Sequence, residues 1–311
     1  MGPEREAGNL SKEKPMKAKL AYYPGCSVEG MAIEYDESTK LLCRLLGIEL
    51  VEIPDWNCCG ATSANNYDPL LGAGLAGRNL ALAEAQGFDT VMTPCPGCLK
   101  SLKGAAEVCR EQPEELASIL QMPFAGNIKC ISILQLLHEF AGSGLLQGLV
   151  KRPLAGRVIV PYYGCLLTRP QSVAGFDDAE NPVSMDELLR AMGATVPDFP
   201  HKTECCGAAY GVTRNRIVGK LSGRILDMAK RLGGDAVAVA CPLCQQNLDL
   251  RQSQVNRFWG RTFNMPVLYI TQLVGYALGL DPAALGIHKL FVSADSLFRE
   301  PPAADSIEVS A

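Results

Sequence analysis

The sequence lacks an apolar run of roughly 18 or more residues, the length that a membrane-spanning helix requires. Its first fifteen residues, MGPEREAGNLSKEKP, are charged and lack the apolar stretch of a secretory signal peptide. We therefore expect a disordered leader over residues 1–15, a disordered tail over residues 299–311, and a cytoplasmic protein without a membrane span.

Patterns that bind several common classes of ligand are also missing. The formal net charge is -4 and no stripe of Lys and Arg is present, so nucleic acid is not an expected partner. No ferredoxin-type Cys-x-x-Cys-x-x-Cys run occurs. The string GAGLAG, residues 72–77, has the spacing of a dinucleotide-binding loop, but it lacks a preceding strand and an acidic residue about 20 positions later. We expect this chain to bind neither flavin nor nicotinamide.

Cysteine, by contrast, is abundant, with 13 in a chain of 311 residues. Thiols stay reduced in the cytoplasm, where many cysteines indicate metal binding or catalysis more often than disulfides. The cysteines therefore carry the first indication of function.

Most of these cysteines lie in motifs that occur twice, in the same order. AYYPGC, which ends at Cys26, returns as VPYYGC ending at Cys165; NCCGAT returns as ECCGAA; and VMTPCPGC ending at Cys98 returns as AVACPLC ending at Cys244. A weaker echo joins residues 128–140 to residues 265–277. The sequence predicts two copies of one unit, over residues 16–150 and 151–298, related by a pseudo-twofold axis.

Within each copy, short β-rich runs alternate with helical patterns. Ser184 and Glu187 have the spacing of a capping box, while Gly47 and Gly193 stand where helix C-terminal caps belong. The predicted strands or extended segments are residues 17–23, 48–56, 88–95, 156–163, 194–202 and 235–241; the predicted helices are residues 31–47, 70–86, 184–193 and 217–232. This alternation predicts an α/β fold with mainly parallel sheets, in which ligands gather at the carboxyl ends of the strands.

Ten cysteines occupy equivalent positions, at strand-to-helix or strand-to-turn junctions. The first set is Cys26, Cys58, Cys59, Cys95 and Cys98; the second set is Cys165, Cys205, Cys206, Cys241 and Cys244. A helix N-terminus stabilises a thiolate, which is the form that binds metal. Gly60 and Gly207 are expected to let the backbone turn sharply after each cysteine doublet, and Gly97 to leave room beside a bulky ligand.

Five thiols exceed the four that a closed zinc site or a cubane iron–sulfur cluster takes. The pattern resembles the duplicated Cys-Cys-Gly domain of the heterodisulfide reductase B-subunit family over residues 20–279. Only the 34-residue interval between Cys206 and Cys241 departs from the family pattern, by one residue, and a shortened loop is expected there.

The resemblance implies that each cysteine set holds a noncubane 4Fe-4S cluster and that a small-molecule or carrier-bound disulfide is reduced between the two clusters. Reducing a disulfide takes two electrons, while such clusters deliver them singly. The family also implies a ferredoxin-like C subunit as electron donor and a flavin-containing A subunit beyond it. The expected function is therefore that of an iron–sulfur catalytic subunit of a disulfide reductase complex.

Three alternatives remain open at the level of the sequence. The chain can be a Cys-Cys-Gly electron-transfer subunit of an oxidoreductase of lactate, glycolate, glycerol-3-phosphate or succinate type. It can hold structural zinc with four of the five thiols of each set. It can be a thioredoxin-like exchanger that uses Cys95-Pro-Gly-Cys98, although that function would not require the doublets.

The remaining candidates have structural as well as functional interpretations. His201 lies four residues before Cys205 and is a candidate proton donor, although a structural role is the commoner one for a lone histidine. The tyrosines that precede the first cysteine of each set, Tyr22, Tyr23, Tyr162 and Tyr163, are expected to wall the clusters against solvent. Cys43, Cys109 and Cys130 are expected to be a buried helix residue, a helix-surface or boundary residue, and a strand residue, none of them a metal ligand.

Overall fold

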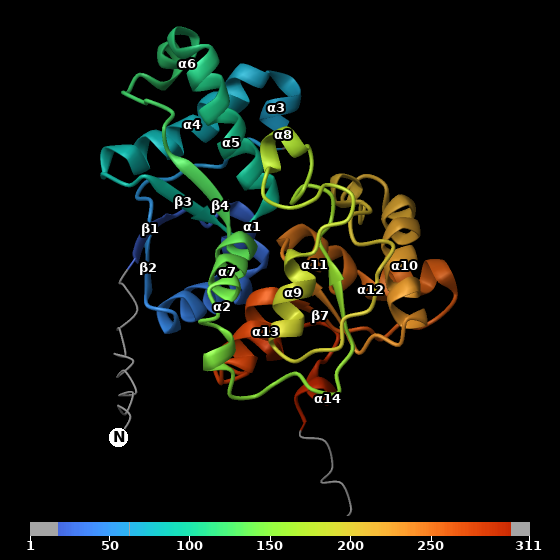
Figure 1. Cartoon of the computed structure of the whole chain (residues 1–311). Helices are drawn as coiled ribbons and strands as arrows, with labels where there is room; N and C mark the ends of the chain where they lie inside the picture. The colour runs from blue at the N-terminus through green and yellow to red at the C-terminus, as the bar shows by residue number, and fades with distance from the viewer. Residues whose placement is uncertain (1–17, 62, 300–311) are drawn as a thin grey trace, which may run out of the picture.

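The computed structural model describes residues 18–61 and 63–299 and contains two parallel sheets. The expected disordered leader lies outside the described residues, as does the expected tail apart from Arg299. The strands are β1 (Ala18–Tyr22), β2 (Ile48–Glu52), β3 (Thr90–Thr93), β4 (Lys129–Ser132), β5 (Ile159–Tyr162), β6 (Ala236–Val239) and β7 (Val267–Tyr269). We call the part from β1 to α7 the first lobe and the part from β5 to α14 the second lobe (Figure 1).

Helices connect the strands of both lobes and cover the sheets. Those of the first lobe are α1 (Cys26–Met31), α2 (Ile33–Leu45), α3 (Ser63–Tyr67), α4 (Pro69–Ala85), α5 (Pro96–Glu111), α6 (Pro113–Leu120) and α7 (Ile133–Gly142). Those of the second lobe are α8 (Gln171–Ala174), α9 (Ser184–Ala191), α10 (Asn215–Arg231), α11 (Pro242–Leu248), α12 (Gln252–Trp259), α13 (Ile270–Ala277) and α14 (Asp295–Phe298).

The two sheets have matching strand orders. The first sheet runs β2-β1-β3-β4 and the second runs β5-β6-β7, with every pair parallel. The segment predicted as extended over residues 194–202 contributes only the bridge between Val158 and Thr195, where β2 stands in the first sheet. Pro197 and Pro200 have no N–H to donate to a ladder, which explains why this segment forms no strand. The α/β fold with parallel sheets predicted from the sequence is confirmed.

Two local predictions about helices need correction. The helix predicted over residues 31–47 corresponds to α2, which begins only at Ile33 because Ala32 leaves the helical conformation with φ of -139° and ψ of 44°; the short helix α1 before it was not predicted. The predicted capping box is wrong: Ser184 is already inside α9, and its buried hydroxyl has no hydrogen-bond partner among the described residues.

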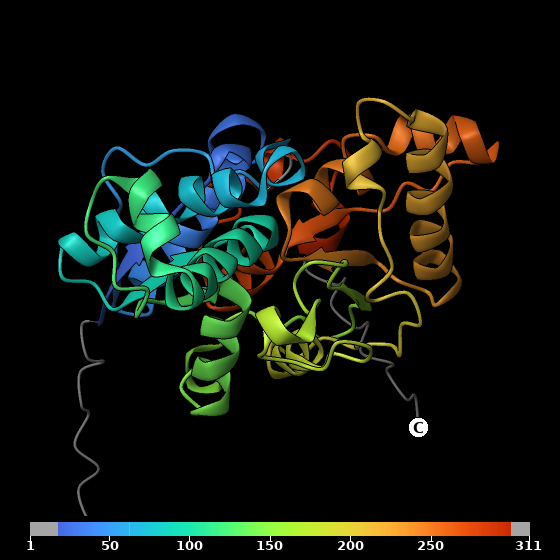
Figure 2. The same ribbon diagram turned by 90° about the horizontal axis from the view of Figure 1, so that it is seen from above.

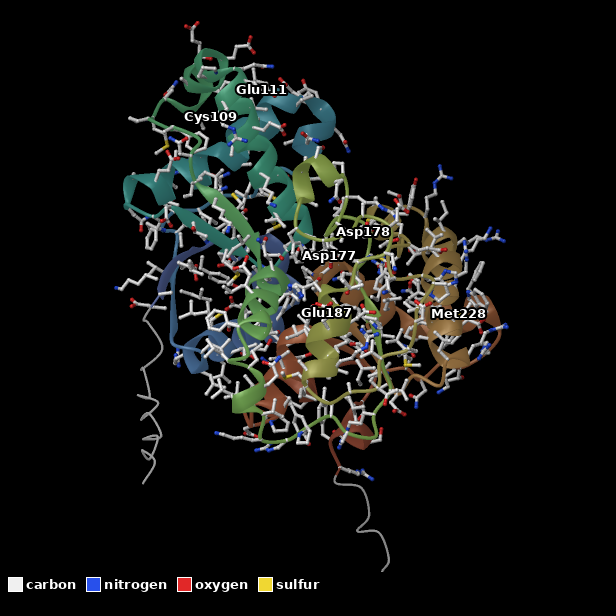
Figure 3. The ribbon with its side chains drawn as sticks, in the orientation of Figure 1. Cys109, Glu111, Asp177, Asp178, Glu187 and Met228 are labelled. Atoms are coloured by element: carbon white, nitrogen blue, oxygen red, sulfur yellow. The ribbon has the colours of Figure 1, made fainter. Side chains whose placement is uncertain are left out.

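Groups from outside the helix cap α9 instead. The Asp177 carboxylate accepts from the backbone N–H groups of Val183 (3.2 Å) and Ser184 (2.9 Å). The Tyr163 hydroxyl accepts from the N–H groups of Met185 (2.7 Å) and Asp186 (3.1 Å). Figure 3 shows Asp177 beside the helix that carries Glu187.

The lobes pack through a reciprocal set of helices and share the largest hydrophobic core cluster, while a second cluster, which includes Val91 and Leu99, belongs to the first lobe alone. Helix α1 contacts α11 while α5 contacts α8, and α2 contacts α13 while α7 contacts α9 (Figures 1 and 2). In each of these two couples of contacts, the second contact joins the counterparts of the helices that the first contact joins, with the lobes interchanged. The contacts therefore have the form of a twofold interface. Tyr35 of α2 stacks on Tyr269 at the end of β7, with ring centroids 3.9 Å apart, and the hydroxyls of Ser38 and Thr271 are 2.7 Å apart. This packing joins the two carboxyl edges into one region.

Candidate metal centre

Three cysteines of the first set lie at the carboxyl ends of β1 and β3, and the doublet lies in the segment that follows β2. Cys26 opens α1 four residues after β1 ends, and Cys95 is the N-cap of α5 just after β3. Pro96 takes the first helical position, where no N–H is needed, so Cys98 falls in the first turn of the helix. The predicted placement of these thiols at a helix N-terminus is confirmed.

The second cysteine set has the same arrangement at its last two cysteines, whereas Cys165 lies in a bend and does not open a helix. Cys165 follows β5, and Cys241 is the N-cap of α11 after β6. Pro242 occupies the first position of α11 and places Cys244 in its first turn. The 34-residue interval before Cys241 therefore leaves its position at the helix start unchanged.

The five sulfurs of the first set converge. The Cys59 and Cys98 sulfurs are 3.3 Å apart, and this contact is the leading cause that lowers the pKa of Cys59 to about 6. Cys95 also has a lowered pKa, chiefly because Cys98 donates to it. Burial raises the pKa of Cys26, and the neighbouring Cys58 sulfur raises it further. Each thiol of this set is thus beside another, and the lowered pKa of Cys59 favours its thiolate form.

The second set converges in the same way. The Cys206 and Cys244 sulfurs are 3.6 Å apart, and the pKa of Cys206 is lowered first by this contact. Cys165 donates to Cys205, which lowers the pKa of Cys205 to about 6. Cys241 adds to the raised pKa of both Cys165 and Cys244, so it lies near both. In each set, the last cysteine forms a hydrogen bond to the second cysteine of the doublet and lowers the pKa of that thiol.

The sulfur sets have an open side and a closed side. Cys26, Cys58 and Cys205 are exposed and Cys165 is partly exposed, whereas the other six cysteines are buried. The open thiols are the first cysteine of each set and the first of each doublet. A molecule from solvent can therefore approach one side of each set, while the protein encloses the other.

A glycine before the first cysteine keeps space for the last sulfur of each set. A Cβ placed on Gly25 would lie 2.9 Å from the Cys98 sulfur, and a Cβ on Gly164 would lie 2.9 Å from the Cys244 sulfur. Both glycines also have positive φ, 76° and 72°, which favours glycine. These two glycines are not among the glycines predicted to shape the site, although a Gly-Cys pair begins both sets.

The glycines predicted to shape the site have different roles. Gly60 and Gly207, with φ of 70° and 87°, turn the backbone after the doublets as expected, and each packs against the next helix. Gly97 has no positive φ; a Cβ there would lie 3.7 Å from the Cys95 sulfur and 3.9 Å from Leu166 of the second lobe. Gly97 therefore keeps an open space where the two lobes meet.

The four tyrosines are buried, and their hydroxyls bond to protein groups. Tyr23 donates to the Asn57 carbonyl (2.8 Å) and Tyr162 to the Glu204 carbonyl (2.6 Å), which are the residues directly before the two doublets. Burial and the surrounding cysteines raise the pKa of both phenols, so both remain protonated donors. These two tyrosines hold the doublets in place, a role signalled by their position three residues before Cys26 and Cys165.

A hydrogen-bond donor that was not predicted from the sequence lies beside the second cysteine of each doublet. Asn247, almost fully buried, directs its amide to the Cys206 carbonyl (3.3 Å) and to the Cys206 sulfur (3.6 Å). Ser101 lies at the equivalent position of the first lobe and helps to lower the pKa of Cys59. Both lie three residues after the last cysteine of a set, one helical turn away, and this shared spacing could have identified them.

Two buried hydroxyls between the lobes have no partner among the described residues, those of Tyr35 and Tyr269. Burial is the main cause that raises the pKa of Tyr35, and Cys241 and Cys95 raise it further. This phenol therefore lies near cysteines of both sets. Ten converging thiols, the space kept by Gly25 and Gly164 and these unpaired donors together fit thiolate-bound iron–sulfur groups that accept hydrogen bonds. Within residues 18–61 and 63–299, no group of three or more His, Cys, Asp or Glu is arranged to hold a single metal ion.

His201 is held beside the second doublet by its neighbours. Its Nδ1 lies 2.9 Å from a Glu204 carboxylate oxygen, but without hydrogen-bonding alignment, and its ring meets Phe199 edge to face at 5.9 Å. Its side chain is largely buried. These contacts account for its position, and its role in proton transfer stays a prediction.

The three remaining cysteines lie apart from both sets in the sequence and are buried. Cys43 is in α2 and Cys130 in β4, as predicted, and burial raises the pKa of each to about 12. Cys109 is near the end of α5, at the outer end of the first lobe in Figure 3, where it donates to the Phe124 carbonyl (3.3 Å). Cys109, predicted to be a helix-surface or boundary residue, lies near the end of its helix but is buried, because the segment after α6 covers it.

Comparisons with known proteins agree with this architecture. The family model described as a cysteine-rich domain, CCG, matches residues 20–103 and 159–249. The 8-methylmenaquinol:fumarate reductase membrane anchor subunit of Wolinella succinogenes is 34% identical over 91% of this chain and 100% of its own length. The B subunit of a ferredoxin/F420H2-dependent CoB-CoM heterodisulfide reductase from Methanosarcina acetivorans is 32% identical over 88% of this chain and 93% of its own length.

A solved structure has the same fold. The crystal structure of a hypothetical protein from Helicobacter pylori superposes with a TM-score of 0.73 over 90% of this chain, at 16% sequence identity. This chain spans 53% of that protein.

One of these relatives is named a membrane anchor. No helix in the described part of this chain has the length and apolar character to cross a bilayer.

The duplicated match and the relatives that align over nearly their whole length identify the family to which the sequence motifs pointed. The chain belongs to the cysteine-rich CCG domain family, in which it carries the domain twice, and its resemblance to the B subunit of heterodisulfide reductase is confirmed.

Proposed function

We propose that this chain is the iron–sulfur catalytic subunit of a heterodisulfide reductase-like complex, which reduces a disulfide in two one-electron steps. The observation that carries the proposal is the pair of five-thiol sets, joined at one interface where Tyr35 lies near Cys95 and Cys241. The name and the aligned length of the Methanosarcina relatives support it. The thirteen free cysteines suit a reducing compartment, and the cytoplasm is part of the proposal.

In the proposed assignment, the first cysteine set and the second cysteine set each ligate one noncubane 4Fe-4S cluster. When bound, the clusters would supply electrons singly. The chain exposes Cys26, Cys58 and Cys205 toward an incoming disulfide and encloses the other side, while Tyr23 and Tyr162 fix the doublets. Gly60, Gly97 and Gly207 shape the space around the ligands.

The overall reaction balances as one disulfide, two electrons and two protons giving two thiols. A ferredoxin-like C subunit is the proposed one-electron donor, with a flavin-containing A subunit behind it. His201, largely buried beside Glu204, is the candidate proton source on the second-lobe side. A small-molecule or carrier-bound disulfide is the proposed substrate.

The metal content of anaerobically purified protein tests this assignment. Two four-iron clusters require about eight irons and a matching amount of acid-labile sulfide per chain. Zinc without sulfide would contradict the proposal, whereas iron and sulfide in this ratio would leave the nature of the electron acceptor as the next question.

Replacing Cys206 by serine tests the role of the second site. We expect Cys206→Ser to lose the second-site iron and the spectroscopic change that a disulfide causes, because Cys206 supplies a thiolate supported by Cys244 and Asn247. The first site should keep its iron. Cys130→Ala is the matched control, since the Cys130 thiol is buried in β4 with a pKa raised to about 12. Unchanged disulfide turnover in Cys206→Ser would contradict a catalytic second site.

The relative named as part of a fumarate reductase favours a second candidate, an electron-transfer subunit of a succinate-type oxidoreductase. The two candidates differ in the acceptor. Disulfide-dependent oxidation of the reduced protein supports the first, whereas oxidation by a quinone analogue with no response to disulfides supports the second.

A further inference from the structure

The segment that follows the second cysteine doublet exposes large apolar side chains to solvent. Val212 is 91% exposed, and Tyr210 and Ile217 are also exposed. Phe258 of α12 is exposed as well, although it packs against Gly219 of α10, so the apolar side chains lie on two neighbouring helices and on the segment before them. An exposed apolar patch that continues over several elements marks a contact with another molecule.

The same region carries a large excess of positive charge. Residues 205–262 contain seven Arg and two Lys, but three Asp and no Glu, although the net charge of the whole chain is -4. Ion pairs with Glu204 and Asp227 take up the charges of Arg224, Arg231 and Arg261. The exposed cations that form no ion pair with any described residue are Arg214, Arg216, Lys220, Lys230 and Arg257.

We call this surface the basic face; its members are Tyr210, Val212, Arg214, Arg216, Ile217, Lys220, Arg257 and Phe258. Its two helices, α10 and α12, contact each other at the outer side of the second lobe (Figures 1 and 2). Trp259 donates to the Gly219 carbonyl (2.9 Å) and ties them together. Tyr210 is four residues after Cys206, so their Cα atoms are at most about 14 Å apart. The basic face therefore lies beside the second cysteine set.

The first lobe has no counterpart of the basic face. Helix α4 follows the first doublet as α10 follows the second, but α4 carries one basic residue, Arg78, and one acidic residue, Glu84. Arg78 is moreover paired with Asp55. The segment between the first doublet and α4 exposes Tyr67 but contains no Lys or Arg. The duplicated architecture thus carries the basic face once.

We infer that the basic face docks an acidic protein with a one-electron redox centre, and that electrons enter this chain at the second cysteine set. Opposite charges speed the encounter of two proteins, and exposed aromatic and aliphatic side chains form the core of their contact. In each transfer the donor loses one electron and the second site gains it, with no exchange of atoms. The inference rests on the proposed function, in which this chain receives electrons singly, and adds the donor's charge and its point of contact.

The composition of the basic face favours a protein over a membrane surface as the occupant. Three of its four cations are arginines, and the planar guanidinium pairs with carboxylates through two parallel hydrogen bonds. Arginine, tyrosine and phenylalanine are enriched in protein interfaces, where lysine is depleted. The apolar members include Tyr210 and Phe258.

A small, acidic bacterial-type ferredoxin is the probe that tests the charge. Arg216→Glu should bind it at least about fivefold more weakly in calorimetry at low salt, and should be reduced by it more slowly in stopped flow, because like charges hinder the encounter. The difference should vanish at about 1 M salt, where the Debye length is roughly 3 Å. Glutamate suits the first turn of α10, so the fold should persist. Reduced methyl viologen, which needs no docking, should reduce the variant at the wild-type rate.

The matched control for charge is Arg44→Glu, which reverses an exposed arginine of α2 in the first lobe. Its affinity for the ferredoxin should stay within about twofold of the wild type. Equal affinities of Arg216→Glu and Arg44→Glu would overturn the inference, and so would a wild-type protein that does not bind the ferredoxin.

A second pair of variants tests the apolar part of the contact. Tyr210→Ala should weaken binding of the ferredoxin about tenfold, because a truncated aromatic side chain in the core of an interface commonly costs that much affinity. Tyr67→Ala is the matched control: Tyr67 is 87% exposed and lies in the equivalent segment of the first lobe. A loss in Tyr67→Ala that equals the loss in Tyr210→Ala would contradict docking at the second lobe.

Vesicles of phosphatidylcholine with about 30% phosphatidylserine test the membrane as occupant. We expect the wild type to remain in the supernatant when these vesicles are sedimented. Cosedimentation that both Arg216→Glu and Tyr210→Ala abolish would assign the basic face to a membrane and overturn the inference.

The docking face and the proposed function fail separately. Disulfide turnover with reduced methyl viologen as donor, but ferredoxin binding that neither Arg216→Glu nor Tyr210→Ala changes, would refute the docking face and leave the reductase function standing. Reduction by ferredoxin that depends on both residues, in a protein that no disulfide oxidises, would refute the reductase function and leave the docking face.

Discussion

At the scale of single residues, the site depends on glycines that leave room for sulfur. Gly164 has φ of 72°, and a Cβ there would be 2.9 Å from the Cys244 sulfur. A left-handed conformation costs an ordinary L-residue roughly 1–2 kcal/mol, and the sulfur contact adds to that cost. The second cysteine set thus leaves no room for a side chain at Gly164.

Gly164→Ala is therefore expected to lose about half of the bound iron, since the second site is disturbed while the first is untouched. Iron and acid-labile sulfide per chain are the measurements. Gly30→Ala is the matched control: Gly30 lies in α1, and nothing stands within 4 Å of its Cβ position. Full iron content in Gly164→Ala would show that the Cys244 sulfur can move without loss of the cluster.

The candidate ligand residues could largely be predicted from the sequence, whereas the residues that support them could not. The cysteines and the prolines Pro96 and Pro242 follow from local spacing, because a strand end, an N-cap and a first helical turn are adjacent in the chain. Asn247 and Tyr162 act on groups 41 and 42 residues away. Contacts of that kind depend on how α11 and β5 pack, which no local pattern records.

At the scale of elements, the start of α9 shows how tertiary contacts replace a local signal. The spacing of Ser184 and Glu187 predicts a capping box, yet Asp177 and Tyr163 take the N–H groups at this end of the helix. Tyr163 is fixed in turn by the carboxylate of Asp186, 2.6 Å away. The strand end before Cys165 is thereby tied to the helix that follows it.

Asp177→Ala is expected to lower the free energy of unfolding by about 1 kcal/mol, the usual cost of losing an N-terminal cap. Ser184→Ala should change stability far less, because its buried hydroxyl has no partner among the described residues. Denaturant unfolding of the two variants under the same conditions makes the comparison. A larger decrease in the free energy of unfolding for Ser184→Ala than for Asp177→Ala would mean that Ser184, and not Asp177, is the main cap of the helix.

At the scale of the whole molecule, the duplication is visible twice, in the motifs and in the reciprocal helix contacts. The sequence predicts two copies, but whether their hydrophobic faces stay apart or merge depends on side chains from both lobes. They merge: the largest core cluster contains Leu42 of α2 and Leu273 of α13. The two copies differ in sequence at one position between the last two cysteines, where the first has Gly97 and the second has Leu243. The contact of Gln246 with Met31, by contrast, depends on how the lobes pack and cannot be predicted from the sequence.

A shared core predicts that the lobes unfold together, and Tyr35 provides the test. Its ring stacks on Tyr269 of the other lobe with an interplanar angle of 6°, and both rings are fully buried. Removing a buried aromatic ring costs about 3–5 kcal/mol, so Tyr35→Ala should lower the stability of both lobes in one transition. Amide hydrogen exchange, which reports on β3 and β6 separately, is the measurement.

Tyr35→Phe separates the ring from its hydroxyl. The hydroxyl has no partner among the described residues, so in the protein without bound clusters this variant should unfold within about 1 kcal/mol of the wild type. Faster exchange in β3 alone after Tyr35→Ala would mean that the lobes are energetically independent. Matched losses in both sheets would mean that the two cysteine sets are held in register by one cooperative core.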